Sequence, residues 1–439
     1  MSGERDAVPR RPRPTPARRV RSAAAAPGLA RPPGPPRSPL AERWGLDPDI
    51  VFLNHGSFGA CPRTVLAAQQ ALRDEMEENP VAFLARRLED RLAAARAAVG
   101  VFAGADPDDL VFLPNATAGI ATVLGSLEIR PGDELLTTDH EYNAALNALR
   151  AAAAEGGARV VLARIPLPVA GPDDVVERVL AAVTPRTRLV LLSHVTSPTA
   201  LVFPVERLVP LLEARGVAVL VDGAHAPGMI PLEIGALGAS WYAANLHKWC
   251  CAPKGAAFLH VRRDRQAAIR PLAVSHAAND PRPTSSPFVR AFDWTGTLDP
   301  TPYLAAPIAL ADVSGMLEGG WPAVMARNSA LARAAREVLL GALGGEPIAP
   351  DSMLGAMAAA DLPVEFGPPP DSPVAEDPLQ AALREHAGVE VPFMGWPRDV
   401  EPGERRRRLV RVSAHLHNHL PDYVALAEAL RGLWVPCEA

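Results

Sequence analysis

Lysine is scarce in this sequence. Only Lys248 and Lys254 occur among its 439 residues, so nearly all of the 44 basic side chains are arginines. A guanidinium stays protonated and does not form a Schiff base with a carbonyl group, whereas a lysine amine can. Chemistry that requires a primary side-chain amine is therefore limited to two positions.

Cysteine is also scarce, and its spacing excludes two kinds of small protein. The four cysteines, Cys61, Cys250, Cys251 and Cys437, contain no C-x-x-C pair. Two adjacent cysteines suit neither a disulfide framework nor a zinc site. We therefore expect no metal site, a cytoplasmic location, and packing roles for the first three cysteines.

Long apolar runs are missing as well. No stretch reaches the roughly 20 apolar residues that a membrane span requires. Hydrophobic residues nevertheless make up 48% of the sequence, which is enough for a sizeable core. Because single cores stop growing near roughly 250–300 residues, we expect two domains.

Residues 1–40 differ in composition from the rest of the chain. They contain ten prolines and nine arginines against two acidic residues, while the whole chain carries a net charge of −5. Such a segment has too few apolar side chains to offset the entropy lost on ordering, so we predict a disordered tail. A basic arm that touches nucleic acid is one alternative. A twin-arginine export signal is another, although the apolar run after it ends at Pro27.

From Trp44 onward, short apolar runs alternate with segments of helical periodicity. This alternation predicts an α/β fold with a mainly parallel sheet, and near-continuous apolar runs such as 217–221 are typical of strands covered on both faces. After about residue 300, a long helical stretch and short strands predict a smaller α+β domain. We predict helices at 62–78, 83–102, 204–215 and 302–340, and strands at 109–113, 134–138, 160–164, 189–195, 217–221, 362–366 and 409–413.

Polar residues follow the apolar runs at five places, and ligands of open α/β sheets bind outside the carboxyl ends of strands. Each place alone is typical of a capped turn. Together they offer a helix N-terminus for an anion, a carboxylate, a planar ring, hydroxyls and one enclosed lysine. Lys248 lies in such an apolar setting, which lowers the pKa of an amine, whereas Lys254 lies in a Pro-Lys-Gly turn typical of an exposed bend. The five places are 113–120, 138–142, 193–199, 222–228 and 245–249.

The order of these motifs resembles the pyridoxal-phosphate enzymes of fold type I, class V aminotransferase group. The likeness covers roughly residues 44–435 and is strongest to the isopenicillin N epimerase-like branch, which is similar to C–S lyases and cysteine desulfurases. It implies an active-site segment at 41–64, a large cofactor-binding domain at 65–305 and a small domain at 306–439. The motifs that carry it are 52–59, 115–117, 139–142, 194–199, 222–225 and 247–249.

The resemblance implies a role for each matching residue. Lys248 matches the lysine that binds pyridoxal 5'-phosphate covalently, Asp222 the partner of the pyridinium nitrogen, and His140 the residue stacked on the ring. An anionic carboxylate there keeps the nitrogen protonated, which makes the ring an electron sink. Further cofactor contacts are implied for Asn115, Ala116, Thr117, Thr196, Ser197, His225, Asn245 and His247, and for Thr297 of a neighbouring subunit in a homodimer with shared active sites.

The same resemblance implies where the substrate binds. Arg411 matches the arginine that grips the substrate α-carboxylate, for which a planar guanidinium is suited. The alternative is that Arg411 only ends the basic run 405–408, and the intervening Leu409 and Val410 argue against it. Asn54 and His55 are expected to line the same pocket. His417 and His419 depart from the usual ending of this motif, which leaves the side-chain selectivity open.

The resemblance implies an enzyme that removes the Cα proton of a small amino-acid substrate, with Lys248 moving the proton. We expect an epimerase or a C–S β-lyase of secondary metabolism, without nucleic-acid or membrane partners. Epimerisation needs a second acid or base, for which Tyr142 and His55 are candidates. The alternatives are an aminotransferase, a cysteine desulfurase, which the lack of cysteine from 252 to 436 disfavours, and a non-catalytic cofactor-binding regulator. A Pro-rich tail does not form the helix-turn-helix module of such regulators.

Overall fold

The computed structural model describes residues 34–282, 286–372, 374–400 and 403–433. Residues 1–33 of the predicted disordered tail, 1–40, lie outside the described residues. Residues 34–40 are described, and Ser38 among them is buried and donates a 2.9 Å hydrogen bond to the Leu416 carbonyl oxygen. Within the described ranges, no helix combines the length and the apolar character that crossing a membrane requires. The domain boundaries drawn from the sequence stay predictions.

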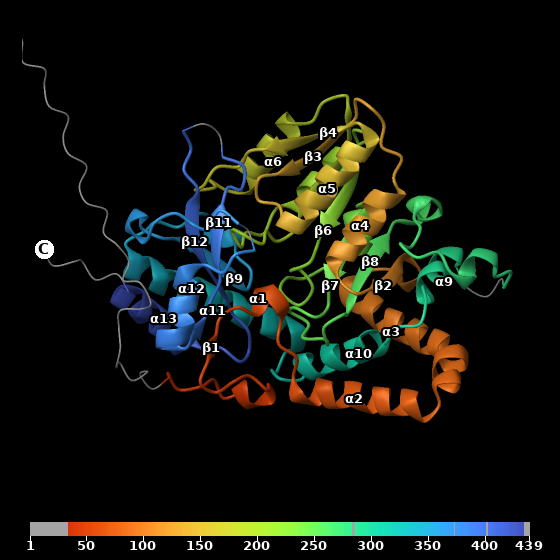
Figure 1. Ribbon diagram of the computed structural model, residues 1–439, viewed down its shortest axis with the longest axis horizontal. Helices are drawn as coiled ribbons and strands as arrows, with labels where there is room; N and C mark the ends of the chain where they lie inside the picture. Colours follow the sequence, from red (N-terminus) through yellow and green to blue (C-terminus); the bar gives the residue numbers. More distant parts are fainter. Residues whose placement is uncertain (1–33, 283–285, 373, 401–402, 434–439) are drawn as a thin grey trace, which may run out of the picture.

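A seven-stranded sheet forms the centre of the larger part of the molecule (Figure 1). Its strand order is β2-β8-β7-β6-β5-β3-β4, in which the strands from β7 to β4 are parallel and β8 is antiparallel to both of its neighbours. The prediction of an α/β fold with a mainly parallel sheet is confirmed. The strands are β2 Leu110–Leu113, β3 Glu134–Thr138, β4 Arg159–Ala163, β5 Thr187–Ser193, β6 Ala218–Asp222, β7 Trp241–Asn245 and β8 Ala257–Val261.

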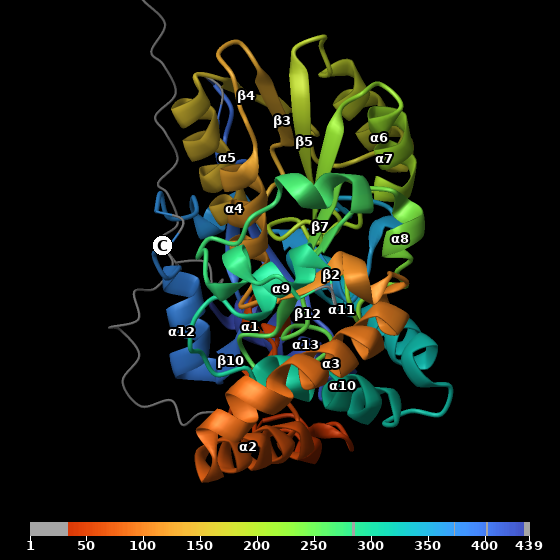
Figure 2. The same cartoon turned by 90° about the vertical axis from the view of Figure 1, so that its right-hand side faces the viewer.

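Alternating side chains of these strands enter two cores, one on each face of the sheet. In β6, Leu220 packs in the core of α4 and α5, whereas Val219 and Val221 pack in the core of α6 and α7. Figure 2 shows these two helix layers on opposite sides of the sheet. Burial on both faces is why the strand reads as a continuous apolar run. The helices are α4 Ala116–Ser126, α5 Asn143–Gly156, α6 Pro172–Ala181, α7 Val205–Glu213 and α8 Ile234–Leu237.

Helices at the edge of the sheet complete the larger part. α2 packs along α10, as Figure 1 shows at the bottom of the molecule. The predicted helix 83–102 is a π-helical segment, Ala82–Arg87, continued by α3. These helices are α2 Arg63–Glu78, α3 Leu88–Ala103, α9 Pro287–Asp293 and α10 Thr301–Ser314. The short helix α1 His55–Phe58 contacts the C-terminal part instead, where the Gly56 N–H donates to Ser413 Oγ at 3.0 Å.

A three-stranded antiparallel sheet, in the order β11-β12-β9, organises the C-terminal part. Strand β1 near the N-terminus pairs with β10 and so ties the N-terminal segment to this part. The elements are β1 Val51–Phe52, β9 Met357–Asp361, β10 Val389–Glu390, β11 Phe393–Trp396, β12 Arg407–Ser413, α11 Gly320–Leu343, α12 Pro378–Ala387 and α13 Leu420–Leu433.

Two sequence predictions for the C-terminal half are wrong. The helical stretch 302–340 is two helices, because the chain turns after Ser314 through Gly319 and Gly320, both of which have a positive φ. The strand expected at 362–366 lies earlier, in β9, and 364–366 form a 3-10 turn. Pro363 has no N–H for the ladder, so the strand ends before it.

Candidate active site

Lys248 lies just beyond the carboxyl end of β7, with its side chain buried. Its Nζ is 3.3 Å from Nε2 of His225. Burial lowers the pKa of Lys248 to about 7, while Asp222 raises it and Arg411 lowers it further. A large share of the amine is therefore neutral near pH 7, which is the form that attacks a carbonyl group. Lys254 lies exposed on a bend.

Asp222 ends β6 and supplies a buried carboxylate. It is 4% exposed, and its Oδ1 accepts a 2.9 Å hydrogen bond from the Ala224 N–H. Burial raises the pKa of Asp222, and the charge of Lys248 lowers it. The carboxylate is thus held in the interior by one backbone donor and by the nearby amine, which leaves it capacity for a cationic ligand group.

A second carboxyl group, on Glu141, lies behind Asp222 and was not assigned from the sequence. Its Oε1 accepts hydrogen bonds from Ser193 Oγ at 2.7 Å and from the Tyr142 N–H at 2.8 Å. Ser193 is the register partner of Asp222 across β5 and β6. Burial, and then the charge of Asp222, raise the pKa of Glu141 to about 8. Glu141 therefore holds a proton at pH 7, and Asp222 is the member of the pair that ionises.

The N-terminus of α4 lies beside the end of β7. The Asn245 Oδ1 accepts a 2.8 Å hydrogen bond from the Ala116 N–H, and the Asn115 Oδ1 caps the helix by accepting from the Ala118 N–H at 2.8 Å. Thr117 is exposed at this end. A helix N-terminus fixed at the end of the sheet is suited to a phosphate group. His247 is turned toward the Ala256 carbonyl oxygen, 2.9 Å from its Nδ1.

His140 is held by the protein on both ring nitrogens. Its Nδ1 is 2.7 Å from Oγ1 of Thr199 and its Nε2 is 2.7 Å from the Ile165 carbonyl oxygen. Burial lowers the pKa of His140 to about 4, so the ring is neutral. Thr196 binds Oγ1 of Thr199 and stays within the same loop. The cofactor-stacking role of His140 stays a prediction.

Arg411 points inward from β12 and is 1% exposed. Its Nη1 donates to the Ser197 carbonyl oxygen at 2.7 Å and to Ser197 Oγ at 3.1 Å, and its Nη2 donates to Ser57 Oγ at 3.0 Å. Ser57 in turn donates to Oδ1 of Asn54 at 2.5 Å. The structure therefore joins Arg411, Ser197 and Asn54 through Ser57, a residue that the sequence analysis did not assign.

Two candidates for the second acid or base have different surroundings. Tyr142 is 43% exposed. It lies close enough to Arg411 to raise the pKa of that guanidinium. His55 is fully buried, with Nδ1 3.1 Å from Nε2 of His417 and Nε2 3.0 Å from the Lys248 carbonyl oxygen. Because both of its nitrogens face protein groups, this placement argues against the predicted substrate-binding and acid–base roles of His55.

Thr297 is exposed in the segment that joins α9 and α10. Thr295 and Gly296 beside it line a cavity of about 350 Å³ together with Leu113 and Pro114, the residues that lead into α4. Within the described residues, no hydrogen bond connects Thr297 to Lys248 of the same chain. Its predicted place in a neighbouring subunit's active site stays a prediction.

Comparison with known proteins decides the family. The model of the aminotransferase class-V family matches residues 51–348. The chain belongs to this family. It is 36% identical to the isopenicillin N epimerase of Amycolatopsis lactamdurans over 89% of this chain and 97% of that protein. It is 32% identical to the isopenicillin N epimerase of Streptomyces clavuligerus over 89% and 96% of the two chains. It is 29% identical to a probable L-cysteine desulfhydrase of Arabidopsis thaliana over 88% and 83%.

Solved structures show the same fold. A cystine C–S lyase in complex with its product cysteine persulfide has a TM-score of 0.72 at 22% identity, over 87% of this chain and 97% of that chain. A cysteine desulfurase of Thermococcus onnurineus NA1 has a TM-score of 0.72 at 19% identity, over 91% and 99%. The fold is therefore fold type I, as the resemblance implied.

Class V membership makes the chain a pyridoxal-phosphate-dependent enzyme, and the residues present fit the cofactor. The site offers a buried amine at Lys248, a buried carboxylate at Asp222 and a helix N-terminus at Ala116. Nδ1 of His225 is also buried beside Lys248 and has no hydrogen-bond partner among the described residues. A polar ligand with an aldehyde, a ring nitrogen and a phosphate would satisfy these groups.

Proposed function

We propose that the protein removes the Cα proton of an amino acid, as an isopenicillin N epimerase-like epimerase or a C–S β-lyase. The observation that carries the proposal is that the guanidinium of Arg411 lies near the amine of Lys248. Arg411 is close enough to lower the pKa of the Lys248 amine, and it is held in place by Ser57 and Ser197. A carboxylate bound by this guanidinium would be held near the amine, which places the Cα of the same amino acid within its reach.

Each residue then has one task. Pyridoxal phosphate, when bound, supplies the sink for the electron pair left at Cα. Arg411 orients the substrate carboxylate, Asp222 holds the proton of the ring nitrogen, and Lys248 takes the Cα proton. Tyr142 is the candidate for a second proton donor, because its ring is partly exposed near Arg411.

A persulfide mechanism fits these residues less well. It needs a reactive thiolate that reaches the substrate sulfur. The described cysteines, Cys61, Cys250 and Cys251, are all buried, and burial raises the pKa of each thiol. Such thiols are inert, so we favour deprotonation at Cα over sulfur transfer to the enzyme.

The proposal is tested by two measurements on the same reaction. Holoenzyme is incubated in deuterated water with L-cysteine, its S-conjugates and small cysteine-containing peptides. Pyruvate is then assayed beside the deuterium content and chirality at Cα. Pyruvate indicates the lyase, and deuterium uptake with inversion and no pyruvate indicates the epimerase. Retention of protium at Cα together with the absence of pyruvate for every substrate would contradict the proposal.

Replacing Arg411 by lysine tests the carboxylate site. Lysine keeps the charge but cannot form the paired N–H contacts of a guanidinium, so kcat/KM should fall about 10- to 100-fold, mainly through KM. Arg405→Lys is the matched control, because Arg405 is exposed on the approach to the same strand. Equal effects of the two substitutions would remove Arg411 from the site.

Coexpression of two inactive variants tests the proposed homodimer with shared sites. Thr297→Asp should place a negative charge against the cofactor phosphate and inactivate the site it serves. If Thr297 serves the neighbouring subunit, a heterodimer of Thr297→Asp with Lys248→Ala keeps one intact site. Random pairing should then restore about a quarter of the wild-type activity. No recovery in an isolated heterodimer carrying two different tags would show that Thr297 does not act across the interface.

A further inference from the structure

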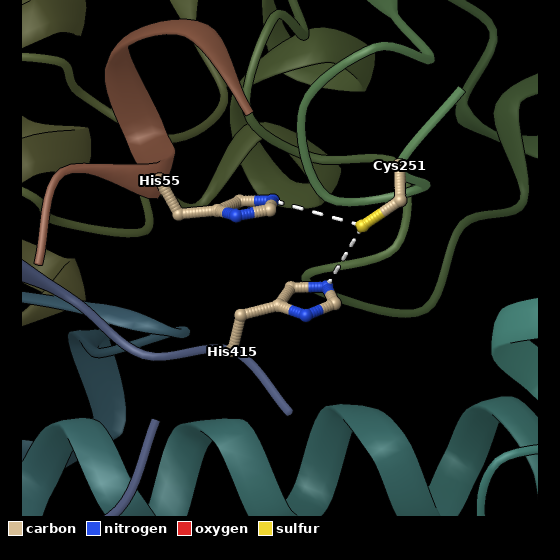
Figure 3. Close-up of side chains that lie close together, drawn as sticks. All are labelled: His55, Cys251 and His415. Carbon is tan, nitrogen blue, oxygen red and sulfur yellow. Dashed lines mark hydrogen bonds between the residues drawn. The ribbon is translucent and has the colours of Figure 1, made fainter. Parts of the chain in front are cut away.

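The loop that joins β7 to β8, residues 246–256, carries Lys248 and is called the Lys248 loop. Beside it, three side chains from distant parts of the sequence meet in the interior (Figure 3). They are His55 from α1, Cys251 from the loop after β7 and His415 from the segment after β12. Cys251 Sγ lies 3.4 Å from Nε2 of His415 and 3.8 Å from Nε2 of His55. One donor atom from each residue lies within 4.8 Å of the other two, and all three residues are buried.

We propose that His55, Cys251 and His415 bind a divalent metal ion of the zinc type. One thiolate and two imidazoles are a donor set that selects zinc over magnesium or calcium. Donors at roughly 2.0–2.3 Å in a tetrahedral array lie about 3.3–3.6 Å from one another. The two sulfur–nitrogen distances, 3.4 and 3.8 Å, are close to this range, and the two nitrogens lie within 4.8 Å of each other, so binding requires the side chains to close around the ion.

Binding rearranges protons within the cluster in a defined way. The Cys251 thiol releases one proton to solvent and forms the sulfur–metal bond. The ring proton of His55, which Nε2 donates to the Lys248 carbonyl oxygen in the metal-free state, moves to Nδ1. There it is donated to Nε2 of His417, 3.1 Å away, so that the lone pair of His55 Nε2 faces the metal. No described residue hydrogen-bonds Nδ1 of His415, so that nitrogen is free to carry the ring proton while Nε2 binds the ion.

Two backbone carbonyl groups lose a hydrogen bond in this step. The Lys248 oxygen is 3.0 Å from His55 Nε2 and the Trp249 oxygen is 3.3 Å from His415 Nε2. Either oxygen, or a water molecule, can take the fourth position of a tetrahedral site. The ion would therefore sit directly against the backbone of the catalytic lysine.

The surroundings hold the imidazole rings in this arrangement. His55 and His415 are stacked with centroids 4.3 Å apart, Trp249 lies 5.1 Å from the His55 ring, and Trp44 lies 5.6 Å from the His415 ring. Such packing fixes ring orientation, as the residues around metal ligands commonly do. Because the ligands come from three separate segments, the ion would tie α1 and the C-terminal part to the Lys248 loop.

Metal content and the identity of the bound atoms test this site directly. The full chain is expressed without a polyhistidine tag in zinc-supplemented medium, since the buried ligands favour loading during folding, and the holoenzyme is desalted in a weak chelator. We expect about one zinc per chain, with sulfur at about 2.3 Å and nitrogen at about 2.0–2.1 Å in the X-ray absorption spectrum of zinc. Cys251→Ser and His415→Gln should each retain less than about a tenth of the wild-type zinc.

Cys250→Ser is the matched control, because Cys250 is the neighbouring buried cysteine outside the cluster. It should retain zinc like the wild type. Absence of zinc from the wild type, a zinc spectrum without sulfur, or equal zinc in Cys251→Ser and Cys250→Ser would each overturn the proposal. Where a cluster variant fails to fold, the sulfur contribution in the wild-type spectrum decides alone.

Discussion

Replacing Lys248 by alanine should abolish covalent attachment of the cofactor and lower kcat by about 10³-fold or more, because in the proposed function the same amine binds the cofactor and moves the Cα proton. The buried position of Lys248 beside His225, and a pKa lowered to about 7 by burial, prepare this amine for both tasks. Borohydride reduction followed by peptide mass spectrometry measures attachment independently of activity. The wild type should carry the cofactor mass on the peptide that contains Lys248.

The second lysine, Lys254, supplies the matched control for the Lys248 substitution. Lys254→Ala makes the same change in the exposed bend that follows, and it should leave both the attachment and kcat close to wild type. Since these are the only lysines of the chain, the two variants together test every side-chain amine. Cofactor found covalently bound in Lys248→Ala would move the assignment to Lys254.

The large sheet was predictable because its strands are buried on both faces. Runs such as 217–221 stay apolar along their whole length, and their polar ends mark the edge where ligands bind. The C-terminal part was harder, because its strands are short and its boundaries depend on single residues. β9 ends at Asp361, shortly before Pro363, and Gly319 is the residue that precedes α11, so a periodicity count across either position places the element wrongly.

Three residues of the candidate site could be proposed from local sequence and a family resemblance: Lys248 and Asp222 at the ends of strands, and Arg411 within β12. In the structure, the charges of Asp222 and Arg411 both act on the Lys248 amine. Contacts that join distant segments were not predictable. The hydrogen bond from Arg411 to Ser57 and the cluster around Cys251 exist only because folding brings α1, β12 and the Lys248 loop together.

The cluster of His55, Cys251 and His415 was also not predictable from the sequence. The expectation of no metal site rested on the spacing of cysteines along the sequence, which detects sites built from one local segment. His55, Cys251 and His415 are separated by more than a hundred residues, and only folding brings their donor atoms together. Spacing therefore carries no information about a site of this kind.

Replacing Asp222 by asparagine should lower kcat by about 10²- to 10³-fold, the scale for removing one preorganised electrostatic partner. The amide is close in size to the carboxylate but carries no charge, so it no longer keeps the ring nitrogen of the cofactor protonated. The nitrogen chemical shift of ring-labelled cofactor reports this directly. It should change from that of a protonated to that of a neutral nitrogen in Asp222→Asn.

Glu141→Gln is the matched control for this substitution. Burial and the charge of Asp222 raise the pKa of Glu141 to about 8, so at pH 7 the wild-type side chain is mainly neutral. Its Oε1 accepts from Ser193 and Tyr142, and a glutamine oxygen can accept both bonds. We expect kcat at pH 7 to change by less than about tenfold. Loss of the protonated nitrogen signal in Glu141→Gln but not in Asp222→Asn would exchange the roles of the two carboxyl groups.

The same two variants should also differ in the pH dependence of cofactor attachment. In cofactor-free wild type, the attachment rate should rise with pH and level off above about 7, because the neutral Lys248 amine is the reactive form. Asp222 favours the protonated amine and so raises its pKa. Removing that charge in Asp222→Asn should move the midpoint to lower pH, whereas Glu141→Gln removes no charge at neutral pH and should leave it near 7. A midpoint that rises or stays in place in Asp222→Asn would show that this carboxylate does not act on the lysine.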